Sequence, residues 1–528
     1  MNLFSLEFVI LLSILLLLYY LLPRKAQWLC LLGASIVFYA FSGAANLIFV
    51  GITSFTTWLA GILMSRFTQQ FQREKKATDV TKEQRKRLKA ILVRKKRMVL
   101  VATLLVNFGI LSYFKYWETI YAGVVKALHP EKGAVSLGIL LPLGISFYTF
   151  QAVGYLIDQY KEAYEPERNY LKYLLFVSFF PQMIQGPINR FAQMKEQLFA
   201  RHDFEWEQTK RALFLILFGM MKKYAIANLL VDAIAAILDS PASDIPGSVV
   251  VVGILMYSAQ QYADFSGGID LVLGIARLFG IQMAPNFRQP YFAVSLGDFW
   301  RRWHISLGAW MKDYVFYPFA LTKAMQKLGK WGIKHLGRDV GRVLPACIGN
   351  ILVFFIVGIW HGAQSHFILW GLYNGVVIAL AELMDPAFTK WKATLKINEN
   401  SKGFHIFRII RTFLIVNIGW YFDRIVDFGD CMLCFKNTIT NFGITRFVPV
   451  MTVLMKDVLS VKVVPVILFA IWLVFVHSYL SEKQKDVYTI LERTNIMVRW
   501  GVYYVLLLLI QFSMSYATSS EAFMYAVF

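Results

Sequence analysis

Two histidines in tryptophan-rich surroundings are the residues of this chain best suited to chemistry. His304 ends the run Phe-Trp-Arg-Arg-Trp-His at 299–304, and His361 stands in Trp-His-Gly at 360–362. Both lie on or beside apolar segments of a chain in which 57% of the residues are hydrophobic. Ionisable groups at membrane depth cost several kcal/mol each, so they are functional candidates by default. The two motifs therefore predict a catalytic centre built inside a membrane.

Histidine side chains of this kind can act as general bases. An unperturbed histidine has a pKa of about 6.5, so the neutral ring can accept a proton near neutral pH. Signatures of other catalytic classes are missing from the sequence, which has no G-x-S-x-G elbow, no Walker A loop and no H-E-x-x-H motif. The chemistry indicated is base catalysis by histidine.

The elements that must position these histidines are membrane helices. The mean hydropathy of +0.51 and the 16% of charged residues are far from a soluble average. A spanning helix needs about 20 mostly apolar residues, and the alternating strands of an outer-membrane barrel are missing from the sequence. We predict an all-α integral membrane protein with about 11–13 transmembrane helices. The apolar windows are 6–22, 27–41, 46–65, 98–115, 136–157, 170–187, 211–237, 248–263, 266–280, 344–359, 366–384, 406–422, 463–480 and 497–517.

The net charge of +21 gathers in short segments beside these windows. Nucleic-acid binding is one reading of such a charge. Positive loops next to spans are, however, the pattern of the positive-inside rule, and they attract anionic lipid. We therefore place 66–97 and the segment after Lys323 in the cytoplasm. The N-terminus is expected outside, because Arg24 and Lys25 follow a first window that does not read as a cleavable signal peptide.

The run from Tyr257 to Pro318 is the least lipid-like apolar region. Its polar residues stand between aromatic ones and include Gln260, Gln261, Asp264, Asp270, Arg277, Arg288, Asp298, Arg301, Arg302, His304, Lys312 and Asp313. At membrane depth such groups are tolerated only where they are buried in protein or line a water-filled cavity. The run predicts a polar cavity within one continuous membrane domain over 1–528.

The four cysteines imply no disulfide framework. Cys431 and Cys434 form a single C-x-x-C without a second pair, beside apolar residues. Ordinary packing is therefore favoured over zinc or redox work at this motif.

Six motifs in the right order resemble the membrane-bound O-acyltransferase (MBOAT) family. They are Leu-Pro-Leu-Gly-Ile-Ser-Phe-Tyr-Thr-Phe-Gln at 141–151, Pro-Gln-Met-Ile-Gln-Gly-Pro at 181–187, Asp-Phe-Ser-Gly at 264–267, Pro-Asn-Phe at 285–287, Phe-Trp-Arg-Arg-Trp-His-Ile-Ser-Leu at 299–307 and Gly-Ile-Trp-His-Gly-Ala at 358–363. The resemblance covers about 1–385. It is strongest to the bacterial alginate and peptidoglycan O-acetyltransferases (AlgI and PatA), which are related to teichoic-acid D-alanylation proteins (DltB). It implies a ring of tilted helices, with re-entrant and interfacial helices around a central tunnel. The implied core lies at about 100–385, with C-terminal helices at 406–517.

The resemblance also implies roles for single residues. By motif match, His361 corresponds to the family's catalytic histidine and His304 to a second histidine of the bacterial branch. Residues 523–528 match an F-x-Y-x-x-F ending of envelope acylation systems, with Tyr525 as its tyrosine. This ending is fused to the acyltransferase in O-acetylation proteins, whereas in D-alanylation it resides on a separate small protein. Residues 364–366 depart from the pattern, because Gln-Ser-His stands where an aromatic is more usual.

The implied reaction is acyl transfer from a thioester. We expect His361 to deprotonate Tyr525, whose phenol has a pKa of about 10 and is a poor nucleophile without help. The tyrosine then carries the acyl group to a hydroxyl of the acceptor. His304 is expected to orient the reactants or to donate to the thioester carbonyl. The donor is expected to be acetyl-CoA, used as a substrate, with no bound cofactor and no metal.

Further residues are candidates for holding the donor. Arg301 and Arg302 suit phosphate or pantetheine groups, and Arg301 shares a face with His304 if both lie on one helix. The other candidates are Trp303, Asp264, Asp313 and Trp360. Competing interpretations stay open. The arginines can form buried ion pairs with Asp298 or Asp313, Asp264 can be a structural acceptor, the tryptophans can pack, His304 can be structural, and Tyr525 can lie in an inert tail.

These features together predict an O-acetyltransferase of the bacterial cytoplasmic (inner) membrane. It would move acetyl groups from cytoplasmic acetyl-CoA to the outer face, onto a cell-envelope or secreted polysaccharide. An SGNH-hydrolase-like partner would receive them, both termini would lie outside, and no nucleic acid would be bound. The first rival is a D-alanyl transferase using a carrier-protein thioester, against which the fused ending argues. A transporter explains buried arginines but not the histidine motifs, and a non-catalytic scaffold is the third rival.

Overall fold

Apolar stretches that the sequence predicts as membrane helices fold as helices throughout the described chain. The structure is a computed structural model that describes residues 6–41, 43, 45–76, 81–128, 138 and 141–516. Within these ranges the one extended pairing is an isolated antiparallel bridge between Phe287 and Trp303, and no strand is formed. The predicted all-α class is confirmed.

The chain divides into two compact units. Of the described residues, the first unit comprises those up to 212 together with 272–284, and the second comprises 213–271 and 285–516. The expectation of one continuous membrane domain stays a prediction. The first unit holds α1 (Leu6–Leu21), η1 (Arg24–Ala26), α2 (Gln27–Phe41), α3 (Asn46–Lys75), α4 (Lys82–Leu128), α5 (Ile145–Tyr160), α6 (Tyr170–Ser178), α7 (Phe180–Gln185) and α8 (Phe191–Leu198).

Two helices, α9 (Trp206–Lys222) and α11 (Gly247–Leu278), contribute residues to both units. The second unit otherwise holds η2 (Lys223–Asn228), α10 (Leu229–Leu238), η3 (Pro290–Phe292), α12 (Leu296–Arg302), α13 (Ile305–Met311), η4 (Lys312–Phe316), α14 (Tyr317–Ala320), α15 (Lys323–His335), α16 (Arg338–His361), α17 (Ser365–Thr394), α18 (Lys402–Arg424), α19 (Phe428–Thr440), η5 (Ile444–Arg446), α20 (Phe447–Met455), α21 (Val464–Glu482), α22 (Val487–Glu492) and α23 (Ile496–Tyr516).

Among the described residues, seven helices are long and apolar enough to cross a membrane. There are eight if the bent pair Phe428–Thr440 and Ile444–Met455 is one span. The seven are Asn46–Lys75, Lys82–Leu128, Trp206–Leu238, Arg338–His361, Ser365–Thr394, Val464–Glu482 and Ile496–Tyr516. They are fewer than the predicted 11–13, because some windows fold as helices that are too short or too polar. Helices α1 and α2 have only 16 and 15 residues, and two predicted windows merge in α11 around Gln260 and Asp264.

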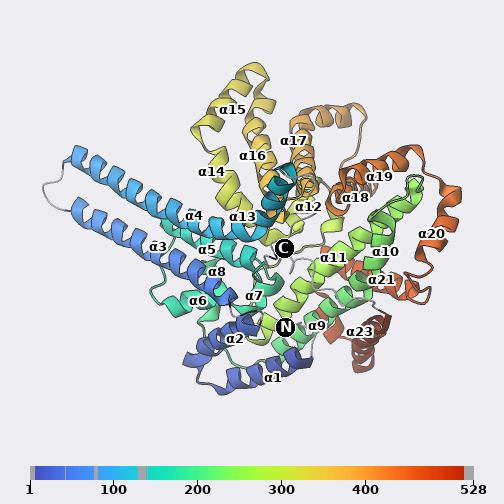
Figure 1. Cartoon of the computed structure of the whole chain (residues 1–528), viewed down its shortest axis with the longest axis horizontal. Coiled ribbons are helices and arrows are strands. Elements are labelled where there is room, and N and C mark those ends of the chain that lie inside the picture. Colours follow the sequence, from blue (N-terminus) through green and yellow to red (C-terminus); the bar gives the residue numbers. More distant parts are fainter. Residues whose placement is uncertain are drawn as a thin grey trace. The chain divides into compact units, whose positions relative to one another are not determined.

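In the first unit, α3 and α4 run side by side as a long hairpin (Figure 1). Helix α5 packs against both, and Ala60, Met64 and Leu156 form a small buried core there. The ammonium of Lys96 is buried and lies 2.6 Å from the Glu162 carboxylate just after α5. This ion pair joins α4 to the end of α5.

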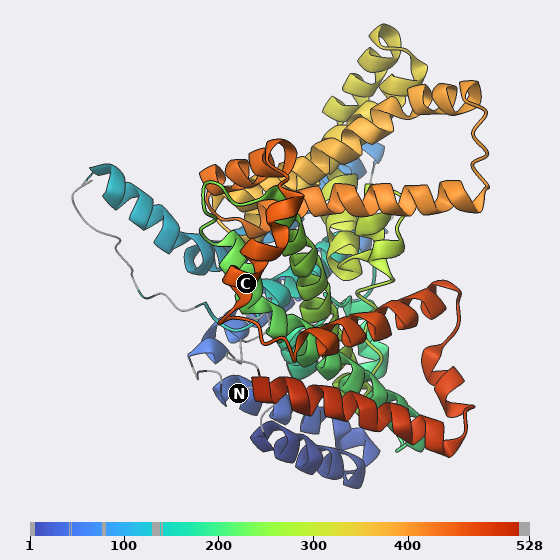
Figure 2. The same cartoon turned by 90° about the vertical axis from the view of Figure 1, so that its right-hand side faces the viewer.

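In the second unit, α16 and α17 pack with almost no space between their backbones. A Cβ added at Gly371 would lie 2.3 Å from the Phe354 carbonyl oxygen, and one at Gly358 would lie 2.5 Å from the Phe367 carbonyl oxygen. Small residues are what allow membrane helices to approach this closely. Helix α17 then pairs with α18, and α21 runs beside α23 with α22 between them (Figure 2). The tight α16–α17 contact sets the position of His361 at the end of α16.

A second close contact joins α9 to α11 and brings buried charges together. A Cβ at Gly219 would lie 2.5 Å from the Gly267 carbonyl oxygen. One turn further along, Lys222 lies 2.6 Å from Asp270, and Lys223 pairs with Asp264 at 2.5 Å. The second pair is almost fully buried, so its charges compensate each other inside the protein.

Candidate active site

His304 lies at a sharp reversal between two short helices. Helix α12 ends at Arg302, Trp303 is extended, and His304 has the left-handed backbone angle φ 48°. The conditional expectation that Arg301 and His304 share a helical face is therefore wrong, because the helix stops before His304. Left-handed backbone is strained for a non-glycine residue, at about 1–3 kcal/mol, and persists where the surroundings enforce it.

The Pro-Asn-Phe motif supplies those surroundings. The Arg288 amide donates to the Arg302 carbonyl at 2.9 Å, and the Ile305 amide donates to the Asn286 carbonyl at 3.0 Å. The bridge between Phe287 and Trp303 lies between these two bonds. Two motifs that are separate in sequence thus form one antiparallel clamp on either side of His304.

Asn286 also determines which nitrogen of His304 carries the proton. Its Oδ1 accepts from the Ser306 backbone amide at 3.0 Å, so this atom is the carboxamide oxygen. The same oxygen lies 3.2 Å from His304 Nδ1. Because an oxygen acceptor needs a donor, the neutral ring carries its proton on Nδ1, and Nε2 is left with a lone pair. In this tautomer His304 can accept a proton or a hydrogen bond at Nε2, but it cannot donate there.

His304 is held neutral by its surroundings. It is only 4% exposed, and the Phe265 ring stands edge-on to the imidazole with 4.8 Å between ring centroids. His304 lies between the short helices α12 and α13, and this segment belongs to none of the seven long helices. Burial lowers the pKa of His304 to about 3, because the charged form loses its hydration. The ring is therefore an acceptor at neutral pH.

His361 lies at the last position of α16, and the structure places it near His304 through Trp360. The Trp360 ring centroid lies 4.9 Å from that of His361 and 6.2 Å from that of His304. On its other sides, the His361 ring stacks on Phe367 at 5.8 Å and meets Trp370 edge-on at 5.1 Å. Two buried histidines thus lie on either side of one tryptophan; their catalytic roles stay a prediction.

The neighbouring tryptophans link the helices that carry the histidines. Trp300 on α12 donates from Nε1 to Asn374 Oδ1 on α17 at 3.0 Å, and its ring meets that of Trp370 at 5.4 Å. Trp303 is 2% exposed and stacks on Phe299. The contacts of Trp300 hold the segment that carries His304 against α17, the helix whose Trp370 also contacts His361.

The two candidate arginines have different surroundings. The Arg302 side chain is 13% exposed and bridges Asp298 at 3.1 Å and Glu482 at 2.8 Å. The Arg301 side chain is 70% exposed, and its guanidinium lies 3.6 Å from Asp298. Arg302 is thus engaged in an ion-pair network, whereas Arg301 is accessible to a ligand.

The remaining predicted site residues are not all brought together. Asp264 pairs with Lys223 in a buried position, as a structural acceptor would. Asp313 is exposed on η4. Tyr525 lies outside the described residues. Within the described ranges, no three His, Cys, Asp or Glu side chains gather to bind a metal ion, and Cys431 and Cys434 are buried on α19.

Sequence reasoning missed three residues that shape this site. Asn286 stands inside a quoted motif, but nothing in the sequence says which histidine nitrogen it meets. Lys222 and Lys223 lie inside the predicted window 211–237, where two adjacent charges in an apolar helix were a signal for buried partners. Their carboxylates are about 40 residues away in sequence, beyond the reach of local pattern.

The family model of the membrane-bound O-acyltransferase (MBOAT) family matches residues 35–416. The chain belongs to this family. Its similar relatives include "Probable alginate O-acetylase AlgI" of Azotobacter vinelandii, 31% identical over 77% of this chain and 71% of the relative. The peptidoglycan O-acetyltransferase of Helicobacter pylori is 30% identical over 66% of each chain. The teichoic acid D-alanyltransferase of Bacillus subtilis is 27% identical over 56% of this chain and 71% of the relative. The protein is thus a multi-pass, membrane-bound acyltransferase of the MBOAT family, with O-acetyltransferases among its relatives.

Proposed function

We propose that this MBOAT protein transfers acetyl groups from cytoplasmic acetyl-CoA to a hydroxyl of a cell-envelope or secreted polysaccharide. The observation that carries the proposal is the pair of buried histidines around Trp360, one of them with its proton held on Nδ1 by Asn286. The names of the alginate and peptidoglycan relatives support O-acetylation. A thioester donor is already activated, so the chain has to supply only a base and a polar environment for the oxyanion.

The first step assigns the base to His361 and the nucleophile to Tyr525. His361 takes the phenolic proton, and the phenolate oxygen attacks the thioester carbonyl. The C–S bond then breaks, and the leaving thiolate takes the proton back from His361. The product is an acetyl ester of Tyr525 and free CoA thiol, so atoms and charge balance.

The second step moves the acetyl group onward. A hydroxyl of the acceptor, or of an SGNH-hydrolase-like partner, attacks the tyrosyl ester while His361 removes its proton. The ester bond between the acetyl carbon and the Tyr525 oxygen then breaks, and the leaving phenolate takes the proton from His361, which regenerates the phenol. His304 would orient the attacking hydroxyl by accepting its hydrogen bond at Nε2, which replaces the expected donation to the thioester carbonyl. Arg301, the more exposed arginine, would contact the phosphates of the donor.

The test follows thioester cleavage and covalent label with radiolabelled acetyl-CoA. We expect label on the wild-type protein and none on His361→Ala or Tyr525→Phe. His335→Ala is the matched control, because His335 is an exposed histidine at the end of α15. Cleavage that needs His361 but leaves Tyr525→Phe active would discard the tyrosine relay and keep the enzyme. Wild-type rates in His361→Ala would overturn the assignment of the base.

D-alanyl transfer from a carrier-protein thioester is the second candidate, and similarity to the Bacillus subtilis D-alanyltransferase favours it. The F-x-Y-x-x-F sequence at 523–528 of this chain argues for O-acetylation instead. Offering acetyl-CoA and a D-alanyl carrier-protein thioester side by side distinguishes the two. If the protein turns over only the carrier-protein thioester, that thioester is the donor and acetyl-CoA is not.

A further inference from the structure

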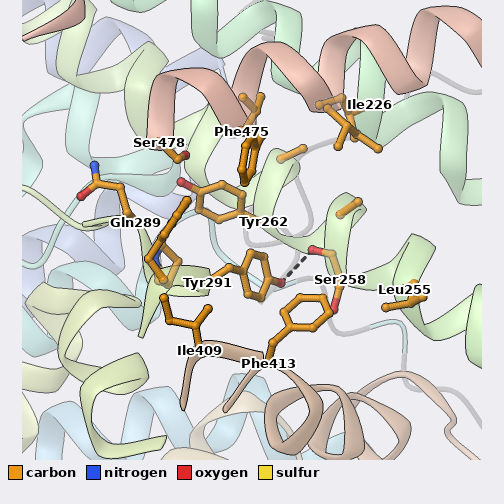
Figure 3. Close-up of a pocket in the computed structure, with 16 residues that line it drawn as sticks. Ile226, Leu255, Ser258, Tyr262, Gln289, Tyr291, Ile409, Phe413, Phe475 and Ser478 are labelled. Atoms are coloured by element: carbon orange, nitrogen blue, oxygen red, sulfur yellow. Dashed lines mark hydrogen bonds between the residues drawn. The ribbon is translucent and has the colours of Figure 1, made fainter. Parts of the chain in front are cut away.

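A cavity of about 460 Å³ opens in the second unit, lined by α11, η2, η3, α18 and α21. Figure 3 shows Tyr262 and Tyr291 across its middle, with Gln289 towards one end and Leu255 towards the other. The cavity is far larger than an acetyl group requires, since it is within the range of about 300–1,000 Å³ that holds whole small ligands. It therefore has room for a ligand that the proposed reaction does not use.

The inner surface of this cavity is hydrocarbon-like. Eleven of the sixteen lining residues are aliphatic, proline or phenylalanine. The polar ones bond to the protein: the Tyr291 hydroxyl donates to the Ser258 carbonyl at 2.9 Å, and Ser258 Oγ donates to Asn417 at 2.7 Å. Cavities with apolar walls of this kind stay dry and take up apolar ligands.

The cavity has one polar end, and that end lies near the end of a spanning helix. Ser478 is one turn before Glu482, the last residue of the spanning helix α21, while Ile471 lies two turns deeper. Along α11 the lining runs from Ala263 to Leu255, which at 1.5 Å per residue is about 12 Å. Because a spanning helix reaches the headgroup region near its ends, the cavity extends from the interface toward the bilayer centre.

Two exposed arginines are sequence neighbours of residues that line the cavity. Arg288 precedes the lining residue Gln289 and is exposed. Arg411, between the lining residues Ile409 and Phe413, is exposed and donates to the Val294 carbonyl at 2.9 Å. Neither arginine has a carboxylate within ion-pair distance in the described part of the chain. A negatively charged headgroup would complement them.

The cavity is also accessible from the surface of the unit. Phe475 and Leu255 line it and are 56% and 41% exposed, so its wall is continuous with the apolar outer face of α21 and α11. A membrane lipid can reach such an opening sideways, without passing through water. An apolar slot with basic residues at its outer end thus matches an amphiphile with an anionic head and a hydrocarbon chain.

We propose that this cavity is a binding site for one anionic phospholipid. The acyl chain lies along Tyr262 and Tyr291 toward Leu255, and the phosphate lies at Arg288 and Arg411. The site adjoins the reaction centre, because the Tyr262 and Tyr291 rings lie 6.0 and 6.3 Å from that of Trp303, the residue before His304. The site rests on geometry alone and does not depend on the acetyl donor.

The experiment counts lipids by native mass spectrometry of the full chain released from nanodiscs. These nanodiscs contain phosphatidylglycerol and phosphatidylcholine with identical chains. We expect one phosphatidylglycerol per wild-type chain to survive activation that strips phosphatidylcholine. Ala259→Phe fills the slot and should lower this retention at least tenfold, with Ala263→Leu as a milder second variant. Arg411→Gln combined with Arg288→Gln should bring the retention ratio of the two lipids to about one.

The matched control is Ile410→Phe, which places the same phenylalanine side chain on α18 at a 54% exposed position outside the lining. It should retain lipid as the wild type does, and thermal unfolding should show that all variants are folded. Unchanged retention in folded Ala259→Phe and Ala263→Leu would overturn the site. Equal retention of both lipids by the wild type would overturn the anionic headgroup. Displacement of the phospholipid by equimolar polyprenyl phosphate would overturn the assignment to a bilayer lipid.

Discussion

His304 combines three constraints that rarely meet in one residue: left-handed backbone, near-complete burial and a side-chain acceptor on Nδ1. Any one of them alone fits a structural histidine. Together they hold an unprotonated Nε2 in a fixed orientation, which is what an accepting group needs before the substrate arrives. The residue that makes this possible is Asn286, whose oxygen is shared by the ring and by Ser306.

Replacing Asn286 should therefore affect catalysis more than binding. In Asn286→Leu the Nδ1 proton of His304 loses its acceptor, so the ring can change tautomer or orientation. We expect kcat to fall at least about tenfold, up to the 10²–10⁴-fold that a positioned acid–base group contributes, with little change in the KM for the donor. The loss of buried hydrogen bonds should also lower the free energy of unfolding by about 1–3 kcal/mol. Steady-state kinetics and thermal unfolding measure the two effects.

Asn286→Asp distinguishes positioning from folding, because it keeps an acceptor oxygen at the same place. Its activity should recover well above that of Asn286→Leu. A folded Asn286→Leu protein with wild-type kcat would show that the tautomer of His304 is irrelevant to the reaction.

The lowered pKa of His304 predicts a specific dependence of stability on pH. The folded state titrates this ring at about 3, and the unfolded chain titrates it near 6.5. Between these values the unfolded state binds a proton that the folded state does not, so His304 lowers stability as pH falls from 6.5 toward 3. The slope from one such group is up to about 1.4 kcal/mol per pH unit. Comparing the thermal unfolding of wild type and His304→Gln between pH 8 and 4 measures the contribution of His304 to this slope.

The wild type should lose stability more steeply than His304→Gln below pH 6.5. Above that pH the two proteins should differ by a constant amount, which is the cost of the substitution. Parallel curves across the whole range would mean that the ring is protonated in the folded state or is solvated.

At the scale of elements, the geometry of the candidate active site depends on how closely α16 and α17 approach. Gly371 lies against the Phe354 backbone, so Gly371→Ala would place a methyl group 2.3 Å from a carbonyl oxygen. Overpacking of this kind costs about 1–3 kcal/mol, and separating the helices would also move His361 away from Trp370. We expect a lower unfolding temperature together with reduced acyl transfer. Gly501→Ala on α23 has nothing within 4 Å and should change neither.

The predictability of these elements follows the range of the interactions that form them. Long apolar windows such as 344–359 and 366–384 predict helices, because hydrophobic periodicity is local. The break after Arg302 could not be predicted, since it depends on backbone bonds to Asn286 and Arg288 from another segment. The seven long helices and the merged α11 differ from the expected 11–13 spans for a related reason. Composition marks apolar stretches, but the buried partners of their polar residues determine whether a helix continues.

At the scale of the whole molecule, the proposed transfer from inside to outside needs a fixed orientation in the membrane. Helix α3 has 30 residues, about 45 Å at 1.5 Å per residue, which is enough to cross a bilayer with its headgroups. Its two ends must then face opposite compartments. The positive segment 66–97 at one end and the uncharged turn at 42–46 at the other predict that the first lies in the cytoplasm and the second outside. Single cysteines at exposed Ala45 and Gln84, in a background without the four native cysteines, report both sides.

An impermeant maleimide should label Ala45→Cys in intact cells and Gln84→Cys only after the membrane is permeabilised. Labelling of both from the outside would mean that α3 does not cross the bilayer. Labelling with the opposite pattern would be more consequential, because the basic hairpin and the proposed acetyl-CoA supply would then lie on different sides. The acetyl group would have to enter from the compartment that lacks coenzyme A. Retained acetyl transfer in such a molecule would require a donor other than acetyl-CoA, so this one measurement constrains both the topology and the chemistry.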